Sequence, residues 1–169
     1  MTARAAGPPP TAVSRRTVLR GGAALSVAVA AGTSVAACTP PVSDRQRAAE
    51  ALVPLVQAAD LQRRQAEQLA PRETAYAAAL GQVAVERGAH AEALTDEINR
   101  LHAPAASGIA VPAGAGTTGL TLEALRTGLS RAAIAASAGA AAADGFRAGL
   151  LASVSASCTA LREIQLGEG

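Results

Sequence analysis

Four stretches of the chain repeat apolar residues every three or four positions, the spacing that places them on one face of an α-helix. The period is clearest between Tyr76 and Leu101, where the apolar positions are mostly Leu and Val. No stretch alternates apolar and polar residues as a half-buried strand does. The pattern predicts an all-α protein with four helices, at about residues 44–69, 72–102, 119–142 and 145–166.

Local signals mark the ends of these helices. Ser43, with Gln46 three residues later, is a capping-box pattern at the start of the first helix. Pro54 is expected to kink that helix, because proline lacks the N–H of one backbone bond, and Pro71 marks the turn that follows. Asp144 precedes the fourth helix and is a candidate N-cap.

The connection between the second and third helices decides the topology. Residues 103–118 are rich in Ala, Gly and Pro and have no apolar period, so we expect an exposed linker. This linker spans about 50 Å when extended at roughly 3.3 Å per residue. A thirty-residue helix is about 45 Å long. The linker can therefore return along the whole bundle, which predicts a four-helix bundle of ferritin-like topology with a long crossover between helices 2 and 3.

Composition indicates a thin core. The chain has 46 Ala, no Trp, one Phe and one Tyr, and residues 38–169 contain 28 Leu, Val, Ile, Phe and Tyr together. Short side chains on the inward faces are expected to let the helices approach closely, with Tyr76 and Phe146 as the largest buried side chains. Cys158 shares one helical face with Val154 and Leu161, which favours a buried thiol that acts as a small apolar group. A reactive thiol or an intermolecular disulfide is the alternative.

The first 37 residues have the charge pattern of a signal peptide. Four arginines, no acidic residue and then the weakly apolar run 21–37 occur in that order. A single membrane-spanning anchor is the alternative, but Gly, Thr and Ser dilute the run. Residues 38–169 keep 11 Arg against 13 acidic residues, a formal charge of −2. This balance argues against a nucleic-acid partner.

Two short motifs refine this interpretation. Arg15 and Arg16, within Ser14–Arg20, resemble the twin-arginine export motif, and Val35–Cys38 resembles a bacterial lipobox. The resemblance implies export by the twin-arginine translocase, cleavage before Cys38 by lipoprotein-processing enzymes, and a lipid on the Cys38 thiol. It further implies a signal peptide at 1–37, a tether at 38–42 and a bundle at 43–169, lipid-anchored on the extracytoplasmic face of the cell membrane.

Glu86, His90 and Glu97 are predicted to lie close together around the second helix, where they could form a polar pocket. The segment 86–94 also resembles part of an alanine-rich actinobacterial family of ferritin-like proteins with no assigned activity, a resemblance that covers about residues 43–166. Ferritin-like di-iron sites use Glu-x-x-His motifs from two helices. Here Glu86 and His90 are four residues apart and no Glu-x-x-His occurs. We therefore expect no metal and no cofactor, and favour a polar pair completed by Arg87 or by an arginine of a neighbouring helix; a polar pocket for an unknown ligand is the alternative.

No pairing of a nucleophile with a base and no phosphate-binding loop is evident in the sequence. The leading hypothesis is a non-enzymatic lipoprotein whose bundle binds a ligand or scaffolds an unknown protein partner. The alternative is a ferritin-like metal-binding protein. That alternative would explain twin-arginine export, because this route carries folded and often cofactor-loaded cargo.

Overall fold

The computed structural model describes residues 42–110 and 119–167, which lie within one compact unit, Pro40–Gly169. Their secondary structure is helical, and no strand occurs among them, as the apolar period predicts. The four α-helices are α1 (Asp44–Leu69), α2 (Ala77–His102), α3 (Leu122–Ala141) and α4 (Gly145–Ala160). Three short segments flank them: the 3-10 helices η1 (Thr74–Tyr76) and η2 (Ala103–Ile109), and the π-helical η3 (Leu161–Gln165).

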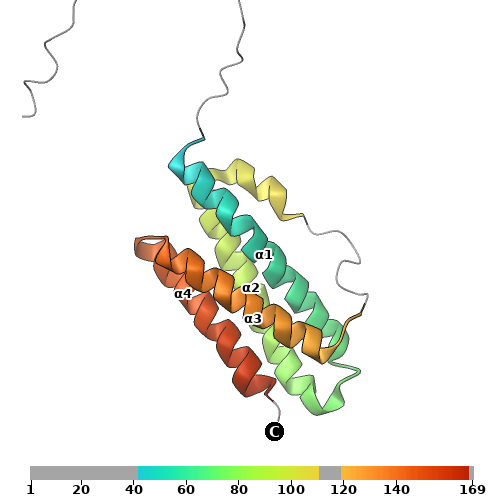
Figure 1. Ribbon diagram of the computed structural model, residues 1–169. Helices are drawn as coiled ribbons and strands as arrows, with labels where there is room; N and C mark the ends of the chain where they lie inside the picture. Colours follow the sequence, from blue (N-terminus) through green and yellow to red (C-terminus); the bar gives the residue numbers. More distant parts are fainter. Residues whose placement is uncertain (1–41, 111–118, 168–169) are drawn as a thin grey trace, which may run out of the picture. The chain divides into compact units, whose positions relative to one another are not determined.

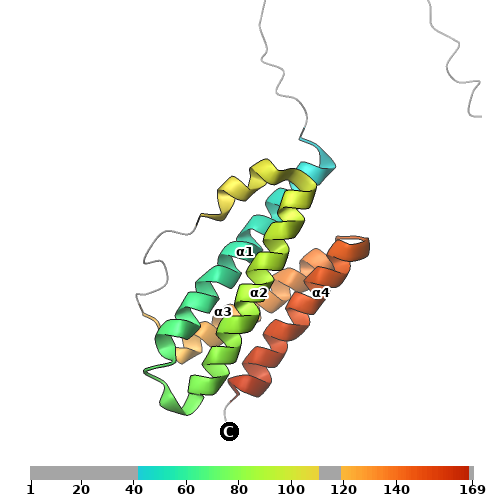
Figure 2. The ribbon, with the colours of Figure 1, turned by 180° about the vertical axis from the view of Figure 1, so that it is seen from behind.

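The bundle consists of two antiparallel hairpins. α1 and α2 pack side by side in the first hairpin, and α3 and α4 form the second (Figure 1). Figure 1 looks onto α1 and α3, whereas Figure 2, from behind, looks onto α2 and α4. η2 packs against one end of the first hairpin, and α3 begins near the other end (Figure 1). α2 and α3 therefore run in the same general direction.

The helix boundaries follow several of the local signals. The Ser43 Oγ accepts a hydrogen bond from the Gln46 backbone N–H at 3.1 Å and so caps α1. The reciprocal half of the capping box is absent, because the Gln46 side chain donates to Glu50 instead. α1 continues as one α-helix through Pro54. Asp144 occupies the N-cap position of α4, but its side chain makes no capping hydrogen bond.

The predicted linker, residues 103–118, is partly structured. Its first seven residues form η2, and Ile109 packs against the apolar side chains of α1 and α2. The Gln57 side chain of α1 donates to the Gly108 carbonyl at 2.7 Å, which ties η2 to the first hairpin. The short helix was not predicted from the sequence, because this segment is rich in turn residues and its few apolar side chains have no period of their own. Residues 111–118 lie outside the described part.

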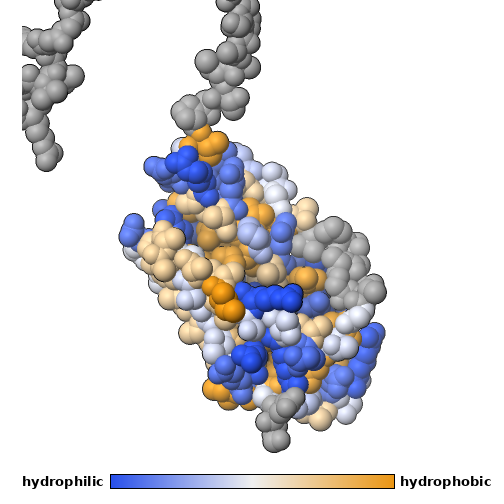
Figure 3. Space-filling view, in the orientation of Figure 1, coloured by the Kyte–Doolittle hydropathy of each residue, from blue (hydrophilic) through white to orange (hydrophobic). Residues whose placement is uncertain are grey.

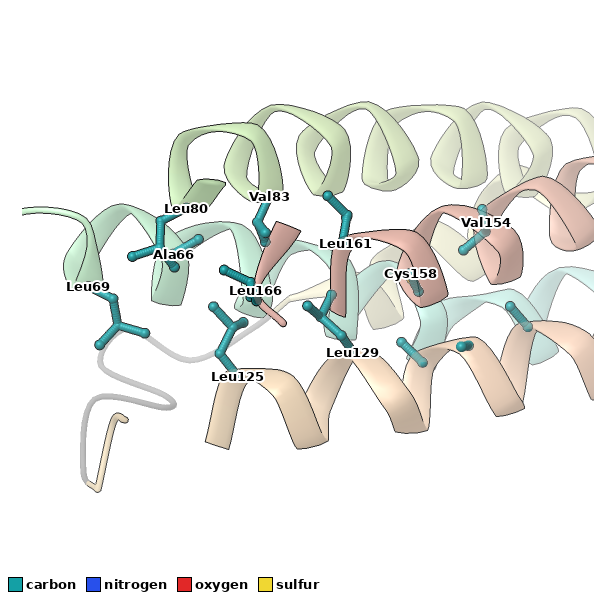
Figure 4. Packing of buried hydrophobic residues seen from close by; sticks show 13 residues of the cluster. Ala66, Leu69, Leu80, Val83, Leu125, Leu129, Val154, Cys158, Leu161 and Leu166 are labelled. Carbon is teal, nitrogen blue, oxygen red and sulfur yellow. The ribbon is translucent and has the colours of Figure 1, made fainter. Parts of the chain in front are cut away.

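Two groups of buried apolar side chains form the interior. The four-helix core lies where all four helices meet, and its side chains point toward one another in Figure 4. The second group, here called the hairpin core, joins α1 and α2 with one residue of α4; it consists of Ala49, Leu52, Val56, Leu94, Ile98 and Leu151. The main buried side chains of the four-helix core are Leu69, Leu80, Val83, Leu125, Leu129, Val154, Leu161 and Leu166.

The expectation that Phe146 and Tyr76 are the largest buried side chains is wrong. Phe146 is 69% exposed, and Tyr76 is half-buried. Arg87 and leucines of the two cores are the largest fully buried side chains instead. The inward residues of α4 are Leu151, Val154 and Cys158, continued by Leu161, and Phe146 lies outside this stripe. Small Ala and Ser residues separate the apolar residues of α4, so their pattern offers little contrast between the buried side of the helix and the sides next to it.

Tyr76 instead takes part in a contact that joins three segments. The Arg126 guanidinium lies 5.5 Å from the centroid of the Tyr76 ring, a cation–π contact. The Arg126 Nε also donates to the Leu166 carbonyl at 2.7 Å. This one side chain of α3 therefore connects η1 and the C-terminal segment beside the four-helix core.

We predict that Phe146→Ala changes the free energy of unfolding by less than about 0.5 kcal/mol, because an exposed ring loses little burial on truncation. Leu129→Ala, at a position that is 0% exposed, is expected to cost about 2–5 kcal/mol. Urea denaturation of residues 39–169 measures both. A large loss for Phe146→Ala would show that α4 buries the side on which Phe146 lies.

Candidate functional site

A partly buried cluster of polar side chains, here called the polar layer, joins α2 to α4. It consists of Glu86, Arg87, His90, Ser157 and Cys158. Arg87 is only 1% exposed. Its Nη1 lies 3.0 Å from the Nδ1 of His90 and 3.1 Å from the Sγ of Cys158, while its buried Nε has no hydrogen-bond partner. Among the described residues, no carboxylate forms an ion pair with Arg87.

Glu86 and His90 both belong to the polar layer, but no direct hydrogen bond joins them. The Glu86 carboxylate accepts hydrogen bonds from the Ser157 hydroxyl of α4 and from the Gln82 side chain. Burial by itself would raise the pKa of Glu86, but these two donors and the nearby His90 lower it further than burial raises it. Glu86 is therefore a charged acceptor that holds α2 against α4.

The electrostatics of the layer keep its other groups unreactive. Burial, and then the positive charge of Arg87, lower the pKa of His90 to about 4 against the opposing effect of Glu86. Burial raises the pKa of Cys158, although Arg87 opposes this. Near neutral pH the layer thus contains a neutral imidazole and a protonated thiol. As expected, Cys158 is a buried free thiol beside Val154 and Leu161, but the arginine next to it was not foreseen.

Glu97 lies apart from the polar layer. It is buried two helical turns beyond His90, and its carboxylate accepts two hydrogen bonds of 2.7 Å from the Arg100 guanidinium. The three residues predicted to share a pocket therefore do not lie together. Glu86 and His90 belong to the polar layer, whereas Glu97 forms a separate ion pair with Arg100. Within residues 42–110 and 119–167, no group of three His, Cys, Asp or Glu side chains is placed to hold a metal ion.

A hollow lies between α1 and α3 and is here called the α1–α3 groove. Its volume is about 600 Å³. Leu52 and Leu55 of α1 face short residues of α3, among them Ala135 and Gly139, and Leu151 of α4 closes part of the wall. Figure 3 looks onto this face and shows hydrophobic surface between hydrophilic side chains. The groove is thus mainly apolar and open to solvent.

Polar groups stand at defined points of this groove. Gln62 of α1 is only 4% exposed, and its Oε1 has no hydrogen-bond partner. A Cβ atom at Gly128 would lie 3.2 Å from the Gln62 Nε2, so the glycine lets α3 approach this side chain. Arg131 and Arg147 also line the groove, and neither side chain has a partner among the described residues. The described lining includes no acidic residue.

Sequence reasoning missed Gln62, Arg131 and Arg147. The available signal was the run of short residues along one side of α3, from Gly128 to Ala142. We expected short residues to bring helices together, and at Gly128 and Gly139 a neighbouring side chain does pack closely against α3. Elsewhere on this side no described neighbouring side chain fills the space, and the same short residues leave a groove.

The three residues that carry the export and lipidation motifs, Arg15, Arg16 and Cys38, lie outside the described residues. Among residues 42–110 and 119–167, no helix has both the length and the apolar composition needed to cross a bilayer. Comparisons of the chain with protein-family models, with curated proteins and with solved structures find no match. The functional argument therefore depends on the polar layer, the groove and the N-terminal motifs.

The depressed pKa of His90 predicts a loss of stability in mild acid. The unfolded chain binds the histidine proton near pH 6.5, whereas the folded chain binds it only near pH 4. The contribution of His90 to stability is therefore complete above pH 6.5 and falls as the pH decreases toward 4. By about pH 5 we expect a loss of roughly 1 kcal/mol, a value reduced for the partial solvent screening of this side chain.

Urea denaturation of residues 39–169 between pH 7 and about pH 5 tests this prediction, with His90→Gln as the control. The glutamine amide can still accept a hydrogen bond from Arg87 but does not titrate. The variant should lose less stability than the wild type over this range, in which Glu86 remains ionised. Equal slopes for the two proteins would contradict the placement of His90 in the polar layer.

Cys158 is predicted to react slowly with thiol reagents while the protein is folded. The side chain is buried and its pKa is raised, so labelling requires local or global opening of the bundle. In residues 39–169 it is the only cysteine. We expect alkylation at least about a thousandfold slower than in denaturant, as measured by mass spectrometry over time. Similar rates in the two conditions would mean that α4 does not bury this face.

Proposed function

We propose that the protein is a lipoprotein, anchored on the extracytoplasmic face of the cell membrane, whose helical bundle binds a small apolar or amphipathic ligand without catalysis. The order of the motifs supports the first part: the Arg15–Arg16 pair, a weakly apolar run, and then Cys38 after two alanines. The observation that carries the second part is the α1–α3 groove. Its volume of about 600 Å³ lies within the range of small-molecule sites, about 300–1,000 Å³.

The position of the groove along the chain also supports this proposal. Only residues 39–43 lie between Cys38 and the start of α1 in the sequence. A lipid on Cys38 would therefore keep the start of α1 close to the bilayer surface. The groove extends to Ala48 and Ala51, in the first two turns of that helix. An apolar ligand drawn from the membrane would have only a short distance to travel.

A non-catalytic role is supported by the protonation states in the polar layer. General base catalysis near neutral pH requires a group whose pKa is close to that pH. The pKa of His90 is too low, at about 4, and that of Cys158 is raised, so neither is prepared for proton abstraction or nucleophilic attack. Neither side chain lines the groove.

We further propose that the connectivity of the bundle is ferritin-like. Two features support it: α2 and α3 run in the same general direction, and η2 lies at one end of the first hairpin whereas α3 begins near the other end (Figure 1). A long crossover between the second and third helices is the feature that ferritin-like bundles share.

Lipidation is tested with Cys38→Ala. We expect the wild type to partition into the detergent phase of a membrane extract, with a mass on its N-terminal peptide that matches diacylglycerol attached to Cys38. The variant should remain uncleaved or leave the membrane. An unmodified Cys38 in the wild type, isolated from native membranes, would refute the anchor.

The export route is tested by replacing both arginines of the motif with lysine, Arg15→Lys with Arg16→Lys. The charge is unchanged, so a block reflects recognition of the arginine pair rather than loss of positive charge. We expect the double variant to be protected from protease added to intact protoplasts, whereas the wild type is digested. Digestion of both proteins at the same rate would contradict the twin-arginine route.

A further inference from the structure

We infer that the α1–α3 groove binds a single-chain anionic lipid, an anionic lysophospholipid, with its acyl chain along α1 and its headgroup at Arg131, while Arg147 adds positive charge to the same wall. This inference rests on the proposed function, because it names the ligand class of the same groove. It depends on three observations: the apolar lining, the two arginines without partners, and the buried amide of Gln62.

The shape of the groove suits one acyl chain. The α1 residues of the lining extend from Ala48 to Gln62, about 21 Å along the helix at 1.5 Å per residue. The side chains over this length are mainly Leu and Ala, which gain from contact with a hydrocarbon chain by the hydrophobic effect. Near Gln62 the groove narrows, because α3 approaches this side chain at Gly128. A volume of about 600 Å³ holds one long acyl chain but not two.

The charge of the groove selects the headgroup. Arg131 is exposed and Arg147 half-buried, and both stand on the wall formed by α3 and α4. Their guanidinium groups have no described partner, and the described lining has no acidic side chain that would neutralise them. Guanidinium groups bind phosphate oxygens through paired hydrogen bonds. An anionic phosphate headgroup therefore complements this wall, whereas a quaternary ammonium headgroup places a positive charge against it.

Gln62 gives a second, independent indication of a ligand. A buried side-chain oxygen without a donor is uncommon in folded proteins and costs about 1–3 kcal/mol. The Oε1 of Gln62 is such an atom, and its side chain lines the groove. A lysophospholipid carries a free glycerol hydroxyl beside its phosphate. The Gln62 Oε1 is covered in this structure, so the amide has to turn toward the groove before that hydroxyl can donate to it while the phosphate contacts Arg131.

The experiment uses residues 39–169, which retain both cores, the polar layer and the whole groove. Binding of palmitoyl lysophosphatidylglycerol and palmitoyl lysophosphatidylcholine is compared below their micelle concentrations by displacement of a neutral apolar dye and by native mass spectrometry. The two lipids have the same chain and differ in headgroup charge. We expect the anionic lipid to bind one per protein and about tenfold or more tightly, the range of a charge-assisted hydrogen bond.

Matched variants locate the site. Ala135→Trp should fill the groove and abolish binding of dye and lipid, whereas Ala138→Trp, at an exposed position of α3 outside the lining, should not. Arg131→Gln with Arg147→Gln should remove the preference for the anionic lipid and leave dye binding intact. The control Arg72→Gln, at an exposed arginine outside the groove, should preserve the preference. Circular dichroism confirms that each variant is folded.

The outcomes separate this inference from the proposed function. If Ala135→Trp blocks dye binding but the wild type binds the two lipids with equal affinity, the anionic ligand is overturned. The proposal of an apolar ligand in the groove then remains. Absence of both dye and lipid binding overturns both proposals. A dimer in native mass spectrometry that Ala135→Trp dissociates would mean that a second copy of the chain occupies the groove, and would overturn the lipid. The inference would also be overturned if the variant that lacks both arginines kept the preference for the anionic lipid.

Discussion

Helices that consist largely of alanine bury little apolar area per residue, so two such hairpins can hold together only where larger side chains from both of them meet. In this protein they meet at the four-helix core. Leu80 and Val83 of the first hairpin pack there with Leu129 of the second, and Leu161 completes the group. Away from this core the facing residues are mainly Ala and Gly. On the side of α1 and α3 these short residues leave unfilled space beside the larger side chains of α1, so the groove is a direct result of where the leucines are.

The polar layer lies between the two cores and limits how the hairpins can be aligned. On α2 it follows Val83 of the four-helix core and precedes Leu94 of the hairpin core. The Arg87 guanidinium is removed from water and bonded only to a neutral imidazole and a thiol, so burial lowers its pKa. A shift of α4 by one turn would remove the Cys158 contact and leave the charge without that partner. The layer thus contributes to specificity at a cost in stability.

Much of the fold follows from the sequence, but the site does not. The first helix was predicted from Asp44 to Leu69, since Ser43 and the turn at Pro71 mark its ends. The inward face of α3, with Leu125 and Leu129, follows from its strong leucine period. The burial of Phe146 was predicted wrongly, because the Ala and Ser residues of α4 give little contrast between neighbouring stripes. The groove could not be predicted at all, because its walls come from different hairpins and its depth depends on which side chains of each helix face the other.

Stability and binding are coupled in such an arrangement. A groove of about 600 Å³ exposes to water the apolar surface that a closely packed bundle would bury. A ligand that binds only the folded chain stabilises it by mass action, by about 2.7 kcal/mol at a hundred times its dissociation constant. The free energy of unfolding of a protein with a thin core is at most a few times larger than this stabilisation, so its stability depends measurably on such a ligand. The scarcity of large side chains that opens the groove therefore also makes the fold sensitive to what fills it.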